Sequence, residues 1–139
     1  TMGDHPQDAA LARRLGLRLV ALPYPAGPGD VVAQVRQVAA LIGRPAAAEA
    51  FAAEVAALAR TAPRQPQPAL MLGGGGLAPA MTGLSAGWLR LAGLAQSQGG
   101  SISLERLVVR PPPVLIINQY RPGQYSQPQA WARHPALAR

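Results

Sequence analysis

The sequence contains no cysteine and no lysine, and it has few acidic residues. The absence of cysteine excludes disulfides, thiolate metal ligands and cysteine nucleophiles, although it does not indicate a cellular compartment. Only six acidic residues occur among 139, and Glu105 is the only one after Glu54. Paired carboxylates for acid–base catalysis therefore cannot come from the second half of the chain.

A long apolar run is also missing. No stretch approaches the ~20 apolar residues that a helix needs to span a bilayer, so we expect a protein that does not cross the membrane. Residues Thr1 to Asp8 are polar and indicate no signal peptide in this segment, so the leader of an exported protein would lie upstream. The 49% apolar content is typical of a folded protein with a hydrophobic core.

Basic residues are plentiful but dispersed. All 13 are arginines, the net charge is +7, and Arg13–Arg14 is the only adjacent pair. A nucleic-acid-binding protein usually gathers its cations on one face or in one run. We therefore interpret the arginines as solvated surface residues and expect no nucleic-acid partner.

The two histidines do not indicate a catalytic or metal site. His5 and His134 are far apart in the sequence, and neither has the spacing of a metal site or of a catalytic triad. With so few acids and no cysteine, the sequence predicts no catalytic residues, no resident metal or cofactor, and no enzyme.

The stretch from Asp30 to Thr61 predicts two helices in series. Asp30 occupies the position of an N-cap for the first helix, and Gly43 the position where it should stop. Pro45 can open the second helix, up to Arg60, because the first helical position has no backbone N–H to lose. Apolar residues at helical spacing form one stripe on the first helix: Val31, Val35, Val38 and Ile42.

Strands are predicted on both sides of these helices. A helix over Gln7–Leu15 and a short strand over Leu17–Leu22 precede them. After them, Ala69–Leu72 and Val114–Ile117 are apolar runs typical of strands, and we expect the last of these to be buried on both faces. The order of elements between these two runs predicts parallel strands joined by a right-handed crossover.

The remaining segments alternate between loops and short helices. Gln96 to Ser101 is polar and contains glycine, so we predict a loop. Trp88 and Trp131 are interpreted as core residues. The predicted helices are Ser85–Ala92, Leu104–Val109 with Ser103 as its cap, and one from Pro128 to Arg133.

Two loops leave the carboxyl ends of the predicted parallel strands. The glycines from Gly73 to Gly76 follow the first strand, and residues 118–127 follow the second. In open α/β sheets the ligand crevice lies along that edge. Tyr120 and Tyr125, on the second loop, are therefore interpreted as ligand contacts.

The glycine run permits two interpretations. Gly73, Gly75 and Ala78 fit the G-x-G-x-x-A pattern of dinucleotide-binding loops after a strand. Against this, Pro79 interrupts the expected helix start, and no acidic residue lies about 20 residues further on to hold a ribose. The other interpretation is a loop whose backbone must approach another group closely.

Glu105 also has two interpretations. In the first turn of a helix a carboxylate is stabilised by the helix dipole. Alternatively, Glu105 is an exposed anion that meets an arginine of a partner protein.

The order of the motifs resembles a known protein family. The passages that carry the resemblance are Leu15–Val20, the two helices from Val31 to Arg60, Gly83–Gly93 (GLSAGWLRLAG), and Ser103–Leu107 followed by Pro112–Asn118. Together and in this order, they resemble the helical-backbone substrate-binding proteins of ABC importers for iron–siderophores, haem and vitamin B12.

The resemblance implies an α/β fold of two lobes with a cleft between them, of which this chain is a fragment. Residues 1–29 would be the tail of the N-terminal lobe, and residues 30–62 would include the inter-lobe helix. Residues 63–139 would form part of a C-terminal Rossmann-like lobe with parallel strands.

The resemblance also implies a function. Such a protein is not an enzyme. It captures an iron chelate, haem or corrinoid and delivers it to an ABC permease, from the periplasm or from a lipid anchor outside the cell. In the vitamin B12 member of this family, a C-lobe glutamate meets arginines of the permease, and the resemblance places Glu105 at the corresponding position. The implied cargo contacts lie in the two cleft loops: Gly74, Gly75, Gly76, Met81, Tyr120, Arg121 and Tyr125. The alternative is a truncated nucleotide-binding Rossmann-like enzyme domain that uses Gly73–Gly76.

Overall fold

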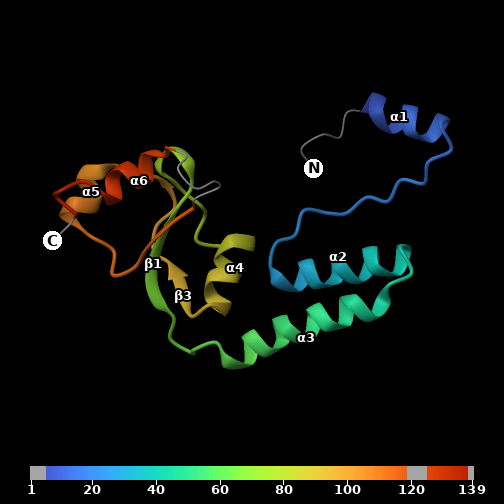
Figure 1. The fold of residues 1–139 in the computed structure, drawn as a ribbon, viewed down its shortest axis with the longest axis horizontal. Helices are drawn as coiled ribbons and strands as arrows, with labels where there is room; N and C mark the ends of the chain where they lie inside the picture. The colour runs from blue at the N-terminus through green and yellow to red at the C-terminus, as the bar shows by residue number, and fades with distance from the viewer. Residues whose placement is uncertain (1–5, 119–124, 138–139) are drawn as a thin grey trace.

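The computed structural model describes residues 6–118 and 125–137. Its N-terminal part is helical, and its C-terminal part is an α/β unit (Figure 1). The helices are α1 (Pro6–Arg14), α2 (Pro28–Leu41), α3 (Pro45–Thr61), α4 (Leu84–Leu91), α5 (Leu104–Val109) and α6 (Gln127–Ala132), with a 3₁₀ turn η1 (Gly74–Gly76). The strands are β1 (Gln67–Leu72), β2 (Leu77–Ala78), β3 (Leu94–Gln96), β4 (Gly100–Ser101) and β5 (Leu115–Ile117).

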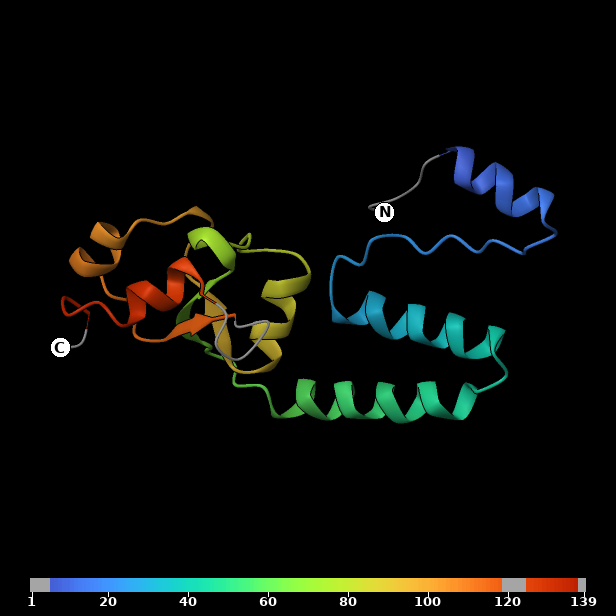
Figure 2. The same ribbon diagram turned by 45° about the horizontal axis from the view of Figure 1, so that its top comes forward.

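The two helices that the apolar spacing and Pro45 predicted are present, and α2 and α3 pack against each other as a hairpin. Gly43 adopts a left-handed φ of +69° at the turn, and the N–H of Arg44 donates to the carbonyl of Ala39 at 2.8 Å. Both nitrogens on one side of the Arg36 guanidinium donate to the Glu49 carboxylate at 2.8 Å, which links the two helices. Figure 2 shows this hairpin extending away from the α/β unit.

The start of α2 differs from the prediction that Asp30 is its N-cap. The helix begins at Pro28, and Gly27 is the N-cap. Proline fits the first helical position, so the helix starts three residues earlier than expected. Asp30 lies in the first turn, where its carboxylate accepts a hydrogen bond of 2.8 Å from the N–H of Ala26.

The α/β unit contains a three-stranded sheet in the order β3-β1-β5, and all of its strands are parallel. The predicted parallel relationship between the strands over Ala69–Leu72 and Val114–Ile117 is therefore confirmed. Strands β2 and β4 form a separate antiparallel pair. Helix α4 lies on the side of the sheet that faces the hairpin, and α5 and α6 lie on the opposite side (Figures 1 and 2).

The core lies between the central strand and the helices α5 and α6. Leu70 and Leu72 are completely buried on one face of β1, and Leu107 of α5 packs against them. Trp131 of α6 packs partly buried against the same cluster, in agreement with its predicted core role. Because side chains alternate along a strand, Ala69, which is also buried, lies on the face toward α4.

The predicted strand over Leu17–Leu22 is wrong. This segment is extended but is not part of a sheet. It runs alongside α2 in both ribbon views (Figures 1 and 2). The Gln34 side-chain amide of α2 donates a hydrogen bond to the carbonyl of Pro23, just after this segment. A strand requires a neighbour for its backbone hydrogen bonds, and none pairs with these residues in the described part of the chain.

Two further predictions about the sheet need correction. Residues 96–101 are not only a loop, because Gln96 ends β3 and Gly100–Ser101 forms β4. Strand β5 is half-buried rather than buried on both faces, because it lies at an edge of the three-stranded sheet. The central strand, with its fully buried leucines, is β1.

Candidate functional site

The carboxyl edge of the parallel sheet gathers several loops. Strand β1 leads into η1, and β3 leads into the turn at residues 97–99. The N-terminus of α4, capped by Gly83, lies at the same end because α4 runs antiparallel to the strands that it connects. This edge is where an open α/β sheet forms its ligand crevice.

The glycine loop is shaped by a contact with Trp131. The N–H of Gly73 donates to the carbonyl of Leu77 at 2.8 Å, which closes the loop. Gly75 and Gly76 both have left-handed φ values, of +72° and +73°. Gly76 is buried, and a Cβ added there would lie 2.4 Å from Cη2 of Trp131. The close backbone approach that the glycines predicted is thus made to the chain's own tryptophan.

The loop does not have the geometry of a dinucleotide-binding turn. In that motif the glycines lead directly into a helix whose N-terminus faces the pyrophosphate. Here Ala78 belongs to β2, and the next helix begins only at Leu84. The nucleotide-binding alternative therefore has no support from this loop.

Met81 lines a cavity of about 260 Å³ between the loop before α4, one face of α4 and the edge strand β3. Its side chain is 59% exposed. The lining residues are Met81, Thr82, Gly83, Ala86, Gly87, Arg90, Ala95 and Gln96. None of them is acidic and Arg90 is the one charged residue, so the cavity combines apolar and uncharged polar surface with one cation.

The other predicted ligand residues lie in different surroundings. Gly75 is exposed, with open space where a Cβ would be, whereas Gly76 is covered by Trp131. Gly74 lies in η1 beside them. The Tyr125 side chain is 80% exposed, just before α6. Tyr120 and Arg121 lie outside the described residues.

Gln96 was not predicted from the sequence, yet it is the one polar residue among the buried side chains of the described chain. It ends β3 and also lines the cavity beside Met81. Its amide bonds to the backbone of Met71 on the neighbouring strand. In the sequence this residue is a single glutamine after two apolar residues, and that pattern does not indicate a hydrogen bond to a neighbouring strand.

Glu105 lies in the first turn of α5, at the end of the molecule opposite the hairpin (Figures 1 and 2). Its own backbone N–H and then the Ser103 hydroxyl hold the pKa of its carboxyl below the ordinary value. The Ser103 side chain also accepts a hydrogen bond of 3.3 Å from the N–H of Arg106, which confirms its predicted cap role. Glu105 is exposed and forms no ion pair within the described residues.

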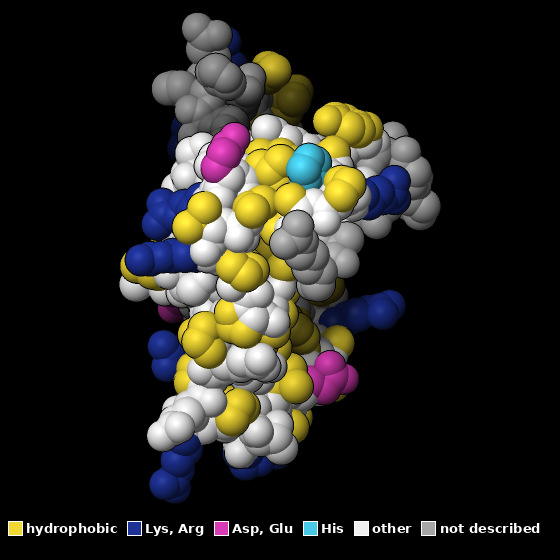
Figure 3. All heavy atoms as spheres, turned by 90° about the vertical axis from the view of Figure 1, so that its left-hand side faces the viewer, with side chains coloured by type: hydrophobic (Ala, Val, Ile, Leu, Met, Phe, Trp, Pro, Cys, Tyr) yellow, Lys and Arg dark blue, Asp and Glu magenta, His cyan; other side chains and the backbone are white. Residues whose placement is uncertain are grey.

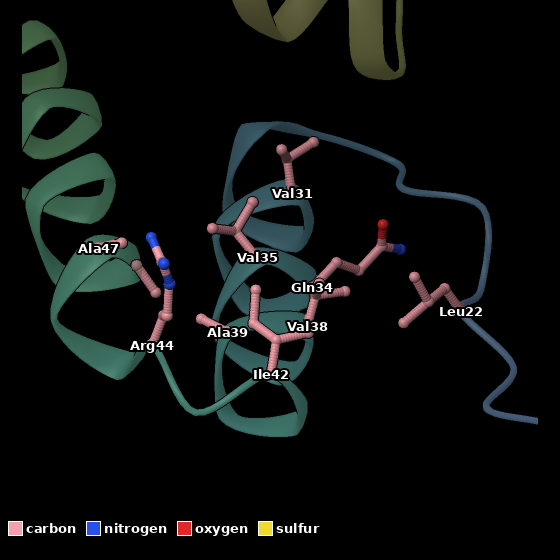
Figure 4. A pocket seen from close by; sticks show the side chains of 10 residues that line it. Leu22, Val31, Gln34, Val35, Val38, Ala39, Ile42, Arg44 and Ala47 are labelled. Atoms are coloured by element: carbon pink, nitrogen blue, oxygen red, sulfur yellow. The ribbon is translucent and has the colours of Figure 1, made fainter. Parts of the chain in front are cut away.

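A second hollow lies on α2. The predicted apolar stripe of this helix lines a groove of about 370 Å³, which Leu22 borders from the extended segment (Figure 4). Its lining is almost entirely apolar and is open to solvent, since the side chain of Ile42 is 65% exposed. Such an open apolar face is typical of a surface that another part of a protein covers.

Charged side chains are dispersed. On the face drawn in Figure 3, arginines stand apart from one another with hydrophobic and uncharged surface between them. Within residues 6–118 and 125–137, no group of three or more His, Cys, Asp or Glu side chains is placed to hold a metal ion. None of the helices described here is both long and apolar enough to cross a membrane.

Three solved structures share this fold. A periplasmic solute binding protein from Veillonella parvula aligns with 96% of this chain at a TM-score of 0.63 and 17% sequence identity. A periplasmic heme binding protein from Pseudomonas aeruginosa aligns with 98% of the chain at a TM-score of 0.60 and 21% identity. The fold is that of part of a periplasmic binding protein. An ABC transporter substrate-binding protein from Listeria monocytogenes aligns with 81% of the chain at a TM-score of 0.51 and 15% identity.

The chain spans about half the length of these structures. It covers 47% of the Veillonella protein, 55% of the Pseudomonas protein and 48% of the Listeria protein. All three are binding proteins by description, two of them periplasmic and one a component of an ABC transporter. No model of a protein family and no curated protein matches the sequence. The α/β fold with parallel strands that the sequence predicted is confirmed.

Proposed function

We propose that this chain is part of a solute-binding protein that captures an iron chelate, haem or corrinoid between two lobes and delivers it to an ABC permease. The observation that carries the proposal is the alignment of the α2–α3 hairpin and the parallel sheet together, over 96% of the chain, with one periplasmic solute binding protein. The protein would work in the periplasm or from a lipid anchor outside the cell, and it would not be an enzyme.

The division of the chain follows from the same proposal. Residues 63–139 would be part of the C-terminal lobe, residues 30–62 would include the inter-lobe helix, and residues 1–29 would end the N-terminal lobe. The open apolar groove on α2 supports this division, because a second lobe would cover it. The extended segment at 17–22 supports it as well, because it has no strand partner among the described residues and could pair with a sheet of the other lobe.

The cargo site would lie at the carboxyl edge of the sheet. Gly75, Met81 and Tyr125 are exposed there or next to it, and Met81 and Tyr125 offer an apolar thioether and an aromatic ring to a large ligand. Gly74 and Gly76 would shape the loop, and Gly76 would do so through its close contact with Trp131. Tyr120 and Arg121 stay predicted contacts of the same site.

Glu105 would dock on the permease. An exposed carboxylate with a lowered pKa stays ionised at neutral pH and is available to a partner's arginine.

A fluorescence titration of the full-length protein tests the proposal, with Trp88 and Trp131 as reporters. The panel contains haem, ferric siderophores, cobalamin and NAD, with corrections for the light that these ligands absorb. Saturable quenching by one metal chelate would support the carrier function and identify the cargo. A response to NAD alone, or to no member of the panel, would overturn it.

A matched pair of variants locates the cargo. Tyr125→Ala should weaken binding of the chelate, because it removes a ring from the proposed site. Tyr24→Ala should not, although Tyr24 is equally exposed, at 80%. Equal effects of the two substitutions would argue against a site at the carboxyl edge.

A further inference from the structure

Strands β1 and β3 separate before the carboxyl edge of the sheet is reached. Their parallel pairing ends where Ala69 faces Gln96, and the last backbone bond runs from the N–H of Ser97 to the carbonyl of Ala69 at 2.8 Å. Beyond this point the chain turns away from β1 to form β4. The next backbone groups on that side of β1, the N–H and carbonyl of Met71, would therefore lack a strand partner.

The side chain of Gln96 takes the place of the missing strand. Its Oε1 accepts a hydrogen bond of 2.9 Å from the N–H of Met71, and its Nε2 donates to the carbonyl of Met71 at 3.2 Å. The same Nε2 donates to the carbonyl of Gln98 at 2.7 Å. Both amide hydrogens are used, and the side chain is only 7% exposed. One buried amide thus joins β1 to the turn that follows β3.

This turn lies directly against the segment that carries Met81. A Cβ added at Gly99 would lie 3.3 Å from the carbonyl oxygen of Pro79 and 3.5 Å from Cα of Ala80. Only a glycine allows this approach without a shift of the neighbouring backbone. The position of the 97–99 turn therefore limits where residues 79–81 lie.

We propose that Gln96 is the positioning residue for the Met81 wall of the cavity at the carboxyl edge. It fixes the 97–99 turn to β1, and the turn supports the segment at 79–81 through Gly99. The consequence for cargo rests on the proposed function, whereas the positioning itself does not need a ligand.

Glutamine is the side chain that this position requires. A methionine of similar length would leave the Met71 N–H and two carbonyls without partners in a buried place. An ionised glutamate could accept from the Met71 N–H but could not donate to either carbonyl. Arg90, which lines the same cavity, is the charged group that an introduced carboxylate would face.

Hydrogen exchange of the full-length protein, without ligand, tests the positioning. In Q96M we expect exchange at least tenfold faster at the N–H of Met71 and across residues 79–83 and 97–100, with the α2–α3 hairpin unchanged. In G99A, which keeps the Gln96 bonds, we expect faster exchange across 79–83 but not at Met71. Unchanged exchange across 79–83 in both variants would overturn the inference, as would a uniform increase throughout the protein.

Cargo affinity separates positioning from a general loss of stability. Q96M should raise the Kd of the chelate found in the panel about tenfold. V55A, which truncates a buried side chain in α3 away from the edge, serves as the control at equal loss of stability. It should leave the Kd within twofold, and an equal loss of affinity in both variants would overturn the inference. If Q96M does not fold, Q96E and G99A supply the same comparison.

The two proposals fail in different ways. A wild-type protein that binds no member of the panel would overturn the proposed function, while hydrogen exchange would still test the role of Gln96. A wild-type protein that binds a chelate, with Q96M binding it equally well, would overturn the role of Gln96 alone.

Discussion

Gly76 lies against the indole ring of Trp131, so close that a Cβ at position 76 would be 2.4 Å from Cη2 and 2.8 Å from Cζ3. The carbonyl of Gly76 also accepts a hydrogen bond of 3.0 Å from the N–H of Ile102 in the core. The first contact joins the loop after β1 to α6, and the second joins it to the residue that follows β4. The glycine run is therefore at least partly a packing feature, and its residues are not equivalent.

The first prediction concerns this contact. Gly76→Ala should lower the free energy of unfolding by about 2–5 kcal/mol, because overpacking costs about 1–3 kcal/mol and a left-handed alanine about 1–2 kcal/mol. Gly75→Ala is the matched control. Its φ is nearly the same, but nothing lies within 4 Å of the added Cβ, so only the conformational cost of about 1–2 kcal/mol applies. Urea unfolding followed by tryptophan fluorescence measures both, and equal losses would contradict the packing role.

The second prediction concerns the core. Leu72→Ala should destabilise the protein by about 2–5 kcal/mol, because Leu72 is completely buried and its truncation leaves a cavity. Leu77→Ala, in the neighbouring strand β2, removes a side chain that is 59% exposed and should change stability by less than about 0.5 kcal/mol. Urea midpoints of the two variants give the comparison. A large effect at Leu77 would indicate that another part of the protein covers it.

The third prediction concerns the ion pair between α2 and α3. The hydrogen bond from Arg36 lowers the pKa of the Glu49 carboxyl below its ordinary value. A depressed folded-state pKa means that the contribution of the pair is present above the unfolded-state pKa and is lost as the pH falls through the folded-state value. Both side chains are more than half exposed, so the effect should be small and should weaken further in salt.

The measurement is the urea midpoint of the wild type and Glu49→Gln at pH 7 and pH 3. The variant should be less stable at pH 7, and the difference should shrink at pH 3. Glu54→Gln, on the same helix, provides the control, because Glu54 pairs with no arginine in the described chain. A difference between the wild type and Glu49→Gln that does not depend on pH would exclude the ion pair as its cause.

The fourth prediction concerns docking. Glu105→Ala should leave cargo affinity unchanged and weaken association with the permease, mainly in the association rate and more at low salt, because peripheral charges act on encounter. Binding of the loaded protein to the permease in a lipid nanodisc measures this effect. Glu54→Ala, an exposed acid on α3, should change neither property. If Glu105→Ala weakened cargo binding as much as docking, the assignment of Glu105 to the permease surface would be wrong.

Local patterns predicted most of the helices correctly. The apolar spacing of Val31 to Ile42 and the proline at position 45 were sufficient for α2 and α3, and Ser103 was sufficient for the start of α5. Each of these signals acts within one or two turns of backbone, because helical hydrogen bonds join residues that are close in sequence. The prediction of Asp30 as the N-cap was wrong for an equally local reason, because Pro28 also favours the start of a helix and lies two residues earlier.

The strands were predicted less well because their hydrogen bonds come from distant segments. Leu17–Leu22 and β3 are both short and partly apolar, yet among the described residues β3 pairs with β1 and Leu17–Leu22 has no strand partner. The candidate site shows the same division. The sequence placed loops at the carboxyl edge of the sheet, but it did not indicate that Gln96 would bond to Met71, 25 positions away.

The amino-acid sequence by itself determined the two helices α2 and α3, the apolar strand over Ala69–Leu72, and the parallel arrangement of β1 and β5. It did so because apolar periodicity, caps and prolines act locally, and because two strands with helices between them are typically joined by a crossover that leaves them parallel. Only the tertiary structure decided that Gly76 supports Trp131, that Gln96 joins β1 to the turn after β3, and that the segment before α2 has no strand partner in the described residues. These features depend on which distant segments meet, and a side chain's role in such a contact is not visible in its immediate neighbours.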